Sequence, residues 1–483
     1  MQLPNKIQLI TYPDSLGGNL QQLNETLDKH FKDCFGGVHI LPPFPSTGDR
    51  GFAPTTYLKI EPEFGTWMDI EDIAERFCVC LDVMVNHVSS QSDYFKDFME
   101  KGKESIYADC FYTFDKFWPD GKLNQNDVDQ VFLRRPKPYS TYKVAGQDTE
   151  VWTTFGNTDP SEQIDLDVNS PQVHKIFEQI FATFSKYKIQ MIRLDAVAFV
   201  TKRMGTSCFF VEPEIDQFLE WITKLADRYN IALLPEVHAP LEIQKKLTDK
   251  GFWTYDFVLP YLILETLFSR SADKLAEYLT DRSHKLFTML DCHDGVPVKP
   301  DVDGLVDSKD ARKVVDVCVE RGSKLSRVLS KSHQSPDGFD VHQICGTYYS
   351  MLGCDDDAYY AARALQLFVP GIPQVYYVGA LAGVNDMERE AEVGDIRELN
   401  RHNYEIDEIE AAMTTPIVQR LKKLFQLRNN HHAFNGEFSF DCPEPHLLSL
   451  AWHHAEEYCC LDVNLQANKT TITYSENGVD KSL

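Results

Sequence analysis

The chain has 483 residues, of which 43% are hydrophobic and 25% are charged, a balance typical of a globular protein with a large core. Its formal net charge of −25 argues against nucleic acid or an anionic membrane as a partner, because both need a basic surface. The sequence has no apolar run of roughly 18 residues and no signal-peptide pattern. Its 12 cysteines lack the spacing of zinc or redox sites. We therefore expect a cytoplasmic protein with reduced thiols; a monomer and a homodimer are both open.

Short apolar runs alternate with longer amphipathic stretches. Eight runs read as strands buried on both faces: Ile7–Tyr12, Gly37–Leu41, Leu81–Val85, Gln190–Leu194, Ala232–Glu236, Tyr255–Leu259, Leu286–Asp291 and Ile372–Val378. Helical periodicity marks Pro171–Lys186, Glu214–Tyr229, Asp356–Val369 and Thr415–His431, and the first of these helices opens with a serine cap and a proline. Eight strands alternating with helices predict an α/β fold, the (β/α)8 TIM barrel.

Two long segments interrupt this alternation of strand and helix patterns, and the C-terminal part of the chain no longer shows it. Structureless loops of such length are unlikely in a compact domain, so each gap predicts a small inserted domain. The tail contains alternating strands, which predict a small antiparallel domain. The expected division is a barrel of residues 1–87, 167–294 and 355–431, an insert domain B of residues 88–166, a second insert domain B′ of residues 295–354, and a C-terminal β domain of residues 432–483.

Three apolar runs lead into a carboxylate: QMIRLDAV contains Asp195, IALLPEVH contains Glu236, and LFTMLDCHD contains Asp294. A buried charge is costly unless it is paired or used. All strand ends of a parallel barrel share one face, so these side chains should converge there. LDVMVNHV adds His87 at the end of the third strand, where an imidazole can bond a sugar hydroxyl. Two suitably spaced carboxyl groups are enough to cleave a glycosidic bond.

The neighbours of these acids suggest their roles. Arg193 stands two residues before Asp195 on the same side of the strand, where its charge would keep the aspartate ionised, as a nucleophile must be. Glu236 follows apolar residues, whose surroundings favour a protonated acid. His293, beside Asp294, could grip a ring hydroxyl. Each residue alone also fits a structural role, such as an ion pair or a buried polar group bonded to backbone. Their combination favours one catalytic pocket.

These segments, in this order, resemble the four conserved regions of the α-amylase superfamily, glycoside hydrolase family 13. The whole chain is similar to its sucrose phosphorylase branch, through KIQLITYPDSLGG, GGVHILPPFP, GDRGFAP, GTSCFFVEPE, IPQVYYVGALAGVNDME and ELNRHNY. The resemblance implies Asp195 as nucleophile, Glu236 as general acid/base and Asp294 as transition-state stabiliser. It implies these substrate-binding residues: Asp49, Phe52, His87, Arg134, Phe155, Gln163, Arg193, His238, His293, Asp340, His342, Gln343, Arg397 and Arg401. The branch generally lacks the superfamily's calcium site, so we expect neither metal nor cofactor.

Two segments resemble the members of this branch that act on a phosphorylated donor. FLRRPKPYS contains Arg134, Arg135 and Lys137, and DGFDVHQI places His342 where plain sucrose phosphorylases typically have tyrosine. A guanidinium binds a phosphate monoester with two hydrogen bonds and an imidazole adds another. Such a local basic patch is needed against the negative charge of the whole chain. The alternative is a solvated basic loop and a surface histidine.

The expected activity is that of a retaining glucoside phosphorylase, a glycosyltransferase-type enzyme using sucrose 6'-phosphate and inorganic phosphate. Alternatives are a sucrose, glucosylglycerol or glucosylglycerate phosphorylase, an amylase-type hydrolase and a non-catalytic sugar-binding protein. Some positions depart from the branch: Ala198-Phe199 replaces the usual glycine-tyrosine, Ala239-Pro240 stands where serine is common, and Ile396 replaces a glycine before Arg397. None of these changes removes a catalytic carboxylate.

Overall fold

The computed structural model describes residues 3–330 and 333–483. Its main sheet has eight strands, all present in the prediction: β1 (Gln8–Thr11), β2 (Gly37–Ile40), β3 (Cys78–Met84), β8 (Met191–Asp195), β9 (Ala232–Pro235), β10 (Thr254–Asp256), β11 (Leu286–Thr288) and β15 (Ile372–Tyr376). Their order is β10-β11-β15-β1-β2-β3-β8-β9. Consecutive barrel strands are neighbours in this order except for β9 and β10, which stand at its two ends, and β15 pairs with β1, as in a nearly closed (β/α)8 barrel. The predicted fold class is confirmed.

Two predicted strands are too long, and buried aspartates explain why. β10 stops at Asp256, whose carboxylate accepts the amide of Leu259, the first residue of the helix α9 (Leu259–Ser269), at 3.0 Å. β11 stops at Thr288, before Asp291 bonds the buried Arg363 at 3.1 Å. In both places a side-chain contact from a distant or following element takes the chain out of the sheet.

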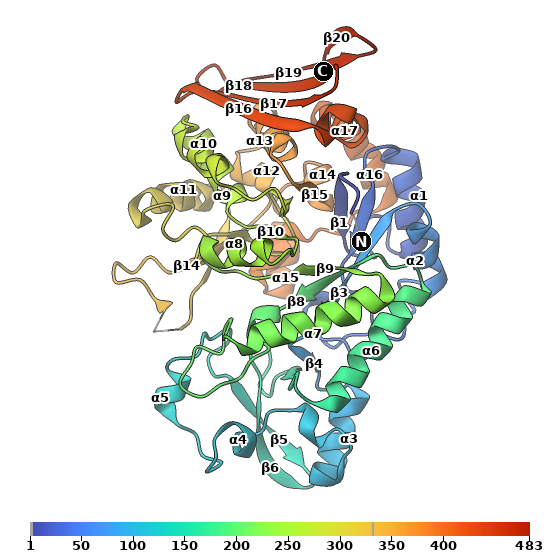
Figure 1. Ribbon diagram of the computed structural model, residues 1–483, viewed down its shortest axis with the longest axis vertical. Helices are drawn as coiled ribbons and strands as arrows, with labels where there is room; N and C mark the ends of the chain where they lie inside the picture. Colours follow the sequence, from blue (N-terminus) through green and yellow to red (C-terminus); the bar gives the residue numbers. More distant parts are fainter. Residues whose placement is uncertain (1–2, 331–332) are drawn as a thin grey trace. The chain divides into compact units, whose positions relative to one another are not determined.

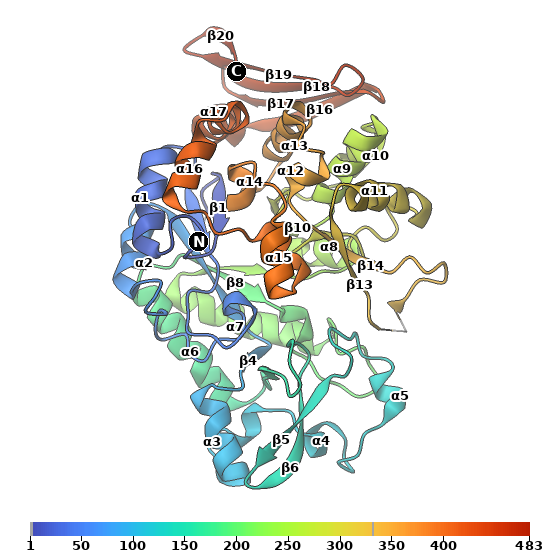
Figure 2. The same ribbon diagram turned by 180° about the vertical axis from the view of Figure 1, so that it is seen from behind.

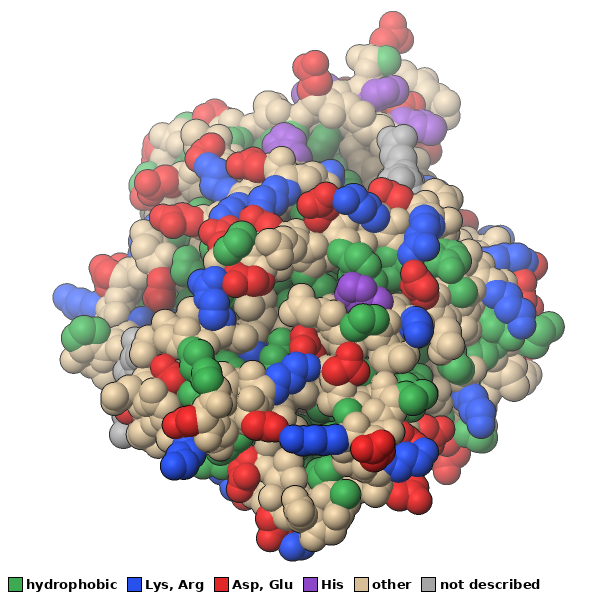
Figure 3. Space-filling model, turned by 60° about the horizontal axis from the view of Figure 1, so that its bottom comes forward, with side chains coloured by type: hydrophobic (Ala, Val, Ile, Leu, Met, Phe, Trp, Pro, Cys, Tyr) green, Lys and Arg blue, Asp and Glu red, His purple; other side chains and the backbone are tan. Residues whose placement is uncertain are grey.

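The described chain forms two compact units. The first unit comprises residues 40–237 and 328–340, and the second comprises residues up to 39, 238–327 and 341–483. None of the described helices has both the length and the apolar run needed to cross a bilayer. On the face that Figure 3 shows, acidic and basic side chains are interspersed, so the charge of −25 is not gathered there in one patch.

In the first unit, amphipathic helices cover the strands β3, β8 and β9. These are α2 (Trp67–Ala74), α6 (Pro171–Lys186) and α7 (Glu214–Tyr229), and α6 and α7 lie side by side (Figure 1). The helix α6 begins where predicted, because Ser170 accepts the amide of Gln172 and Pro171 occupies the first turn. Its apolar residues recur at helical spacing and are buried, while His174 stacks on Trp221 of α7 at 4.0 Å.

The first insert has its own secondary structure and an aromatic core. The hairpin of β5 (Tyr139–Val144) and β6 (Gln147–Trp152) packs near α3 (Asp93–Lys101), and Phe117, Trp118 and Trp152 form much of the core. The remaining elements of this unit are β4 (His87–Ser89), β7 (Gln163–Asp165), α4 (Phe114–Phe117), α5 (Gln125–Val128) and the 3-10 turns η1 (Asp49–Gly51), η2 (Gly102–Glu104), η3 (Ala108–Cys110) and η4 (Val197–Phe199). The segment 328–340 contacts this insert, where Phe132 meets His333 edge to face at 4.8 Å.

The second insert contributes a small sheet to the second unit. Its strands β12 (Val296–Pro297), β14 (Val341–Cys345) and β13 (Lys324–Arg327) are antiparallel, with β14 in the centre. Around them and the barrel strands of this unit lie α1 (Leu20–His30), α8 (Leu241–Asp249), α9, α10 (Asp273–Thr280), α11 (Ser308–Glu320), α12 (Tyr348–Met351), α13 (Asp356–Phe368), α14 (Tyr377–Ala380), α15 (Met387–Val393), η6 (Ile396–Asn400), α16 (Ile406–Met413), α17 (Pro416–Asn430) and η7 (His432–Asn435).

The predicted C-terminal antiparallel domain is a five-stranded sheet of the second unit. Its strands follow chain order: β16 (Glu437–Glu444), β17 (Leu447–His454), β18 (Glu457–Asn464), β19 (Lys469–Glu476) and β20 (Val479–Ser482). In both ribbon views the sheet lies over α13 and α17 (Figures 1 and 2). Trp452 of β17 fastens it, because its indole nitrogen donates to the Phe368 carbonyl at 2.7 Å.

Candidate active site

Two of the predicted catalytic acids stand at the ends of neighbouring strands in the first unit. Asp195 is the last residue of β8, and Glu236 directly follows β9. The parallel register pairs Leu194 with Pro235, and the Glu236 amide donates to the Leu194 carbonyl at 3.1 Å. Neighbouring strands are about 4.8 Å apart and paired positions point to the same face. The two carboxyl groups therefore lie close together on one edge of the sheet.

One guanidinium contacts both acids. Arg193 Nη1 lies 2.8 Å from Asp195 Oδ1, and Arg193 Nη2 lies 3.7 Å from Glu236 Oε1. The same arginine binds Asp82, which faces it across the β3–β8 register. The Arg193 side chain is 4% exposed, so little water screens these charges. The predicted pairing of Arg193 with Asp195 is confirmed.

Arg193 interacts differently with Asp195 and with Glu236. The 2.8 Å contact with Asp195 is a charge-assisted hydrogen bond, whereas 3.7 Å from Glu236 is too long for one. Glu236 instead accepts the amide of Ala196 at 3.2 Å. The apolar residues that precede Glu236 in the sequence are thus only part of its surroundings, because a cation and a backbone amide also lie beside it. The two carboxyl groups therefore differ in their contacts with the same arginine.

His87 presents a neutral imidazole from the short ribbon of β4 and β7. Its Nε2 donates to the Phe52 carbonyl at 3.0 Å, and its ring meets that of Phe155 at 5.4 Å. Burial lowers the pKa of His87, although the carboxylate of Asp165 opposes this. Nδ1 is buried and has no hydrogen-bond partner among the described residues. A neutral ring with an acceptor nitrogen suits a sugar hydroxyl, as the sequence predicted.

Sequence reasoning missed the buried ion pair behind His87. Lys202 lies 2.8 Å from both Asp165 and the Asn86 amide oxygen, and neither charged side chain is exposed. Asp82, the third acid on Arg193, was also not assigned a role. In the sequence, these residues show only as charged residues inside or after an apolar run. Their partners lie far away along the chain.

The structure gives the remaining predicted residues of the first unit definite places. Arg193 lies over the ring of Phe52, 5.8 Å from its centre, and Arg134 lies 5.9 Å from the centre of Phe155. Gln163 is buried on β7 opposite Ser89 of β4. The other two residues lie on loops: Asp49 opens the turn η1, and Asp340 accepts the amide of Ser335 at 2.6 Å.

The basic segment around Arg134 separates into different environments. The guanidinium of Arg135 is buried and donates to Ser140 and Thr153 at 2.8 Å each, so it holds the insert together. Lys137 pairs with Asp159 at 2.9 Å. Of this segment, Arg134 is the member that lies over an aromatic ring of the candidate site.

In the second unit, Asp294 lies between two arginines. Its Oδ1 is 3.6 Å from Arg397 Nη1 and 3.7 Å from Arg401 Nη2. Arg401 is 1% exposed and donates to the His293 carbonyl at 2.8 Å. Asp395 grips Arg397 through two nitrogens, the shorter distance being 2.6 Å. Arg401 also pairs with Glu398 at 3.3 Å, so both arginines beside Asp294 are shared with a second carboxylate.

Behind Asp294, a glycine lets two segments approach closely. A Cβ on Gly295 would stand 2.7 Å from the Ile344 carbonyl and 2.9 Å from Gln343 Cβ, so only glycine fits. The close approach brings β12 against β14, which carries His342 and Gln343. The ring of His342 faces that of His238, with centres 5.8 Å apart.

Cys292, His293 and Asp294 offer three potential ligand atoms within 4.8 Å of one another. A cation there would face the two guanidinium groups beside Asp294. Like charges at such distances repel, so this cluster suits an anion or a neutral sugar better than a metal ion.

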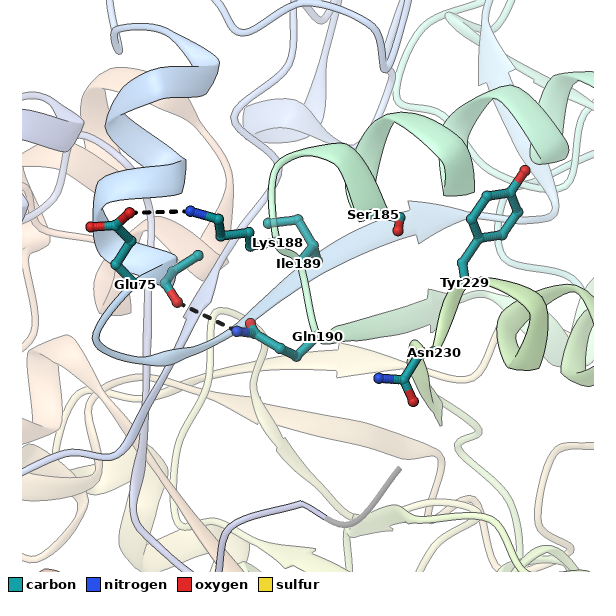
Figure 4. Close-up of a pocket in the computed structure, with 8 residues that line it drawn as sticks. Glu75, Ser185, Lys188, Ile189, Gln190, Tyr229 and Asn230 are labelled. Carbon is teal, nitrogen blue, oxygen red and sulfur yellow. Dashed lines mark hydrogen bonds and ion pairs between the residues drawn. The ribbon is translucent and has the colours of Figure 1, made fainter.

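A cavity of about 680 Å³ opens at the opposite ends of the strands that carry Asp195 and Glu236 (Figure 4). The helices α2, α6 and α7 all end there, and their C-terminal dipoles favour a cation. Lys188 supplies it, pairing with Glu71 at 2.9 Å and with Glu75 at 3.1 Å. The helix ends and the Lys188 ion pairs explain this polar cavity, which lies away from the candidate catalytic residues.

Comparison with known proteins agrees with this geometry. The catalytic-domain model of alpha-amylase matches residues 11–276. The chain belongs to the alpha-amylase family. Within that family it is 57% identical to a sucrose 6(F)-phosphate phosphorylase of Thermoanaerobacterium thermosaccharolyticum over 99% of both chains. It is 40% identical to a sucrose phosphorylase of Streptococcus mutans, over 100% of this chain and 99% of that one.

A solved structure gives the same result for this alpha-amylase family member. The crystal structure of a sucrose 6F-phosphate phosphorylase from Thermoanaerobacter thermosaccharolyticum matches with a TM-score of 0.99 at 56% identity. The match covers 100% of this chain and 99% of that one. The predicted membership of the α-amylase superfamily, in its sucrose phosphorylase branch, is confirmed.

Proposed function

We propose that the chain is a retaining phosphorylase that converts sucrose 6'-phosphate and inorganic phosphate into α-glucose 1-phosphate and fructose 6-phosphate. The observation that carries this proposal is the pair Asp195 and Glu236, on adjacent strand ends and in reach of one guanidinium. Retaining glycoside chemistry needs carboxyl groups about 5–5.5 Å apart, whereas inversion needs about 6.5–9.5 Å. The identity of 57% to a relative of that name supports the choice of donor.

In the proposed reaction, Asp195 attacks the anomeric carbon while Glu236 protonates the departing ketose oxygen. The glycosidic bond breaks and a β-glucosyl ester forms on Asp195. A phosphate oxygen then attacks the same carbon, the ester bond breaks, and Glu236 recovers a proton from the phosphate. Two displacements give net retention. The close bond from Arg193 suits Asp195 as both the attacking and the leaving carboxylate.

We assign the other residues by the same proposal. Asp294 stabilises the positive charge that develops on the sugar, and His87, His293, Asp49 and Phe52 bind the glucosyl ring. Arg134 and His342 recognise the donor phosphate, and Arg397 and Arg401 bind the incoming phosphate. The remaining substrate-binding proposals are Phe155, Gln163, Arg193, His238, Asp340 and Gln343.

The proposal also includes an insert domain B of residues 88–166, a second insert domain B′ of residues 295–354 and a C-terminal β domain of residues 432–483. It further includes a cytoplasmic location and a monomeric or homodimeric state.

The test is phosphate-dependent release of glucose 1-phosphate from four donors: sucrose 6'-phosphate, sucrose, glucosylglycerol and glucosylglycerate. We expect kcat/KM for sucrose 6'-phosphate to exceed that for sucrose by at least about tenfold, the discrimination of one charged hydrogen bond. NMR should show the α anomer. Equal glucose release without phosphate would indicate a hydrolase, and the β anomer would indicate inversion. A higher kcat/KM for another donor would reassign the substrate.

A further inference from the structure

Asp301, which the sequence analysis did not single out, lies against His238 in the second unit. Its Oδ2 is 3.3 Å from His238 Nδ1, and Asp301 is 1% exposed in the loop between β12 and α11. On one face, the imidazole of His238 stacks on Phe257 with ring centres 3.9 Å apart. A buried carboxylate on one ring nitrogen fixes both the tautomer and the orientation of a histidine.

The same loop fixes a second imidazole. His342 Nδ1 lies 2.6 Å from the carbonyl oxygen of Lys299, two residues before Asp301. A carbonyl only accepts, so Nδ1 of His342 carries a hydrogen. The two rings meet edge to face at 5.8 Å and 70°. One short loop therefore orients two histidines that face each other.

This arrangement determines what each ring offers through Nε2. With Nδ1 donating, Nε2 accepts when the ring is neutral and donates when the ring is protonated. Phosphate ester oxygens are anionic acceptors, so they select the protonated ring. The carboxylate of Asp301 stabilises that positive charge on His238. Two imidazoles held in this way match a phosphate monoester better than a neutral sugar.

We propose that Asp301 is a positioning residue for recognition of the donor phosphate. It orients His238, and the Nε2 atoms of His238 and His342 together contact the phosphate of the ketose, donating hydrogen bonds when their rings are protonated. This inference rests on the proposed function and adds to it a second histidine and the acid that holds it.

The experiment compares kcat/KM for sucrose 6'-phosphate with that for sucrose in Asp301→Asn, His238→Gln and the double variant. We expect the ratio to fall about tenfold in each single variant, chiefly through KM of the phosphorylated donor. The double variant should fall no further, because both changes act through one ring. Asp316→Asn, which removes an exposed carboxylate of α11, is the matched control and should keep the ratio.

Equal losses for both donors, an unchanged ratio, or additive effects in the double variant would overturn the proposal. If Asp301→Asn does not fold, His238→Gln decides alone, and an unchanged ratio in it overturns the proposal.

Calorimetry with fructose 6-phosphate and fructose separates this inference from the proposed function. If the unmodified enzyme phosphorolyses neither donor, the proposed function fails. A selective loss of fructose 6-phosphate affinity in Asp301→Asn would still support the phosphate clamp, whereas unchanged affinity would reject it.

Discussion

The two candidate clusters of this protein differ in their balance of charge. In the first unit, Arg193 serves three carboxylates, those of Asp82, Asp195 and Glu236. In the second unit, Arg397 and Arg401 stand beside Asp294, and each also pairs with a further carboxylate, that of Asp395 or Glu398. The first cluster therefore has one cation for three acids, whereas the second has two cations for three acids.

Within the first cluster, the distances to Arg193 differ. At 2.8 and 3.7 Å, the arginine interacts more strongly with Asp195 than with Glu236. In the second cluster, each arginine is shared between Asp294 and a second acid. Guanidinium groups held in this way can also bind an anionic substrate, which the net charge of −25 otherwise disfavours.

The largest expected effect is in the cluster around Arg193. Asp195→Asn removes the proposed nucleophile but keeps the shape of the side chain, so kcat for glucose 1-phosphate release should fall by at least about 10⁴-fold. Circular dichroism and the melting temperature should show an intact fold. Glu220→Gln, an exposed change on α7, should leave turnover as it is. Turnover within tenfold of the unmodified enzyme would remove Asp195 from the mechanism.

An intermediate effect is expected in the cluster around Asp294, Arg397 and Arg401. Arg397→Gln removes one of the two charges beside Asp294, so KM for phosphate should rise about tenfold and the hydrolysed share of product should increase. The measurement is the ratio of glucose to glucose 1-phosphate at varied phosphate. Arg420→Gln serves as the control, because it removes a guanidinium that stacks on Tyr360 and was not assigned to the candidate site. An unchanged ratio in Arg397→Gln would show that Arg397 has a structural role and does not bind phosphate.

The smallest effect concerns stability. Burial lowers the pKa of His87 from 6.5, so the unfolded chain binds this proton more readily than the folded one. The free energy of unfolding should therefore fall as the pH drops below about 6.5, and this part of the loss should be missing in His87→Gln. Urea unfolding at pH 7 and pH 5 measures it. The exposed His454→Gln should follow the unmodified protein, and an identical loss in His87→Gln would contradict the assignment.

Local signals in the sequence were enough to place the strands and several helices. The cap at Ser170 and Pro171 defined the start of α6, and apolar runs defined eight buried strands. In the tail, LLSLAWHH, YCCLDVNL and KTTITY read as strands, whereas β16 and β20 were not predicted because their side chains are mostly exposed. β10 and β11 ended earlier than predicted, since aspartates within or after the runs bind partners outside the sheet.

The candidate site was predictable where a residue's chemistry shows in its neighbours. Arg193 and Asp195 are two residues apart, and their contact follows from strand geometry. Asp82 meets Arg193 from 111 positions away, and Asp301 meets His238 from 63 positions away. Such pairs depend on the register of strands and the path of loops, which no local pattern contains.

The polar cavity beside Lys188 offers a practical handle on this protein. It lies at the start of β8, about 16 Å from Asp195 by strand rise, and Asn230 at its rim is exposed. A linker attached at Asn230 would tether the molecule to a solid support from that side. The working ends of β8 and β9 would then point away from the surface, open to bulk reactants.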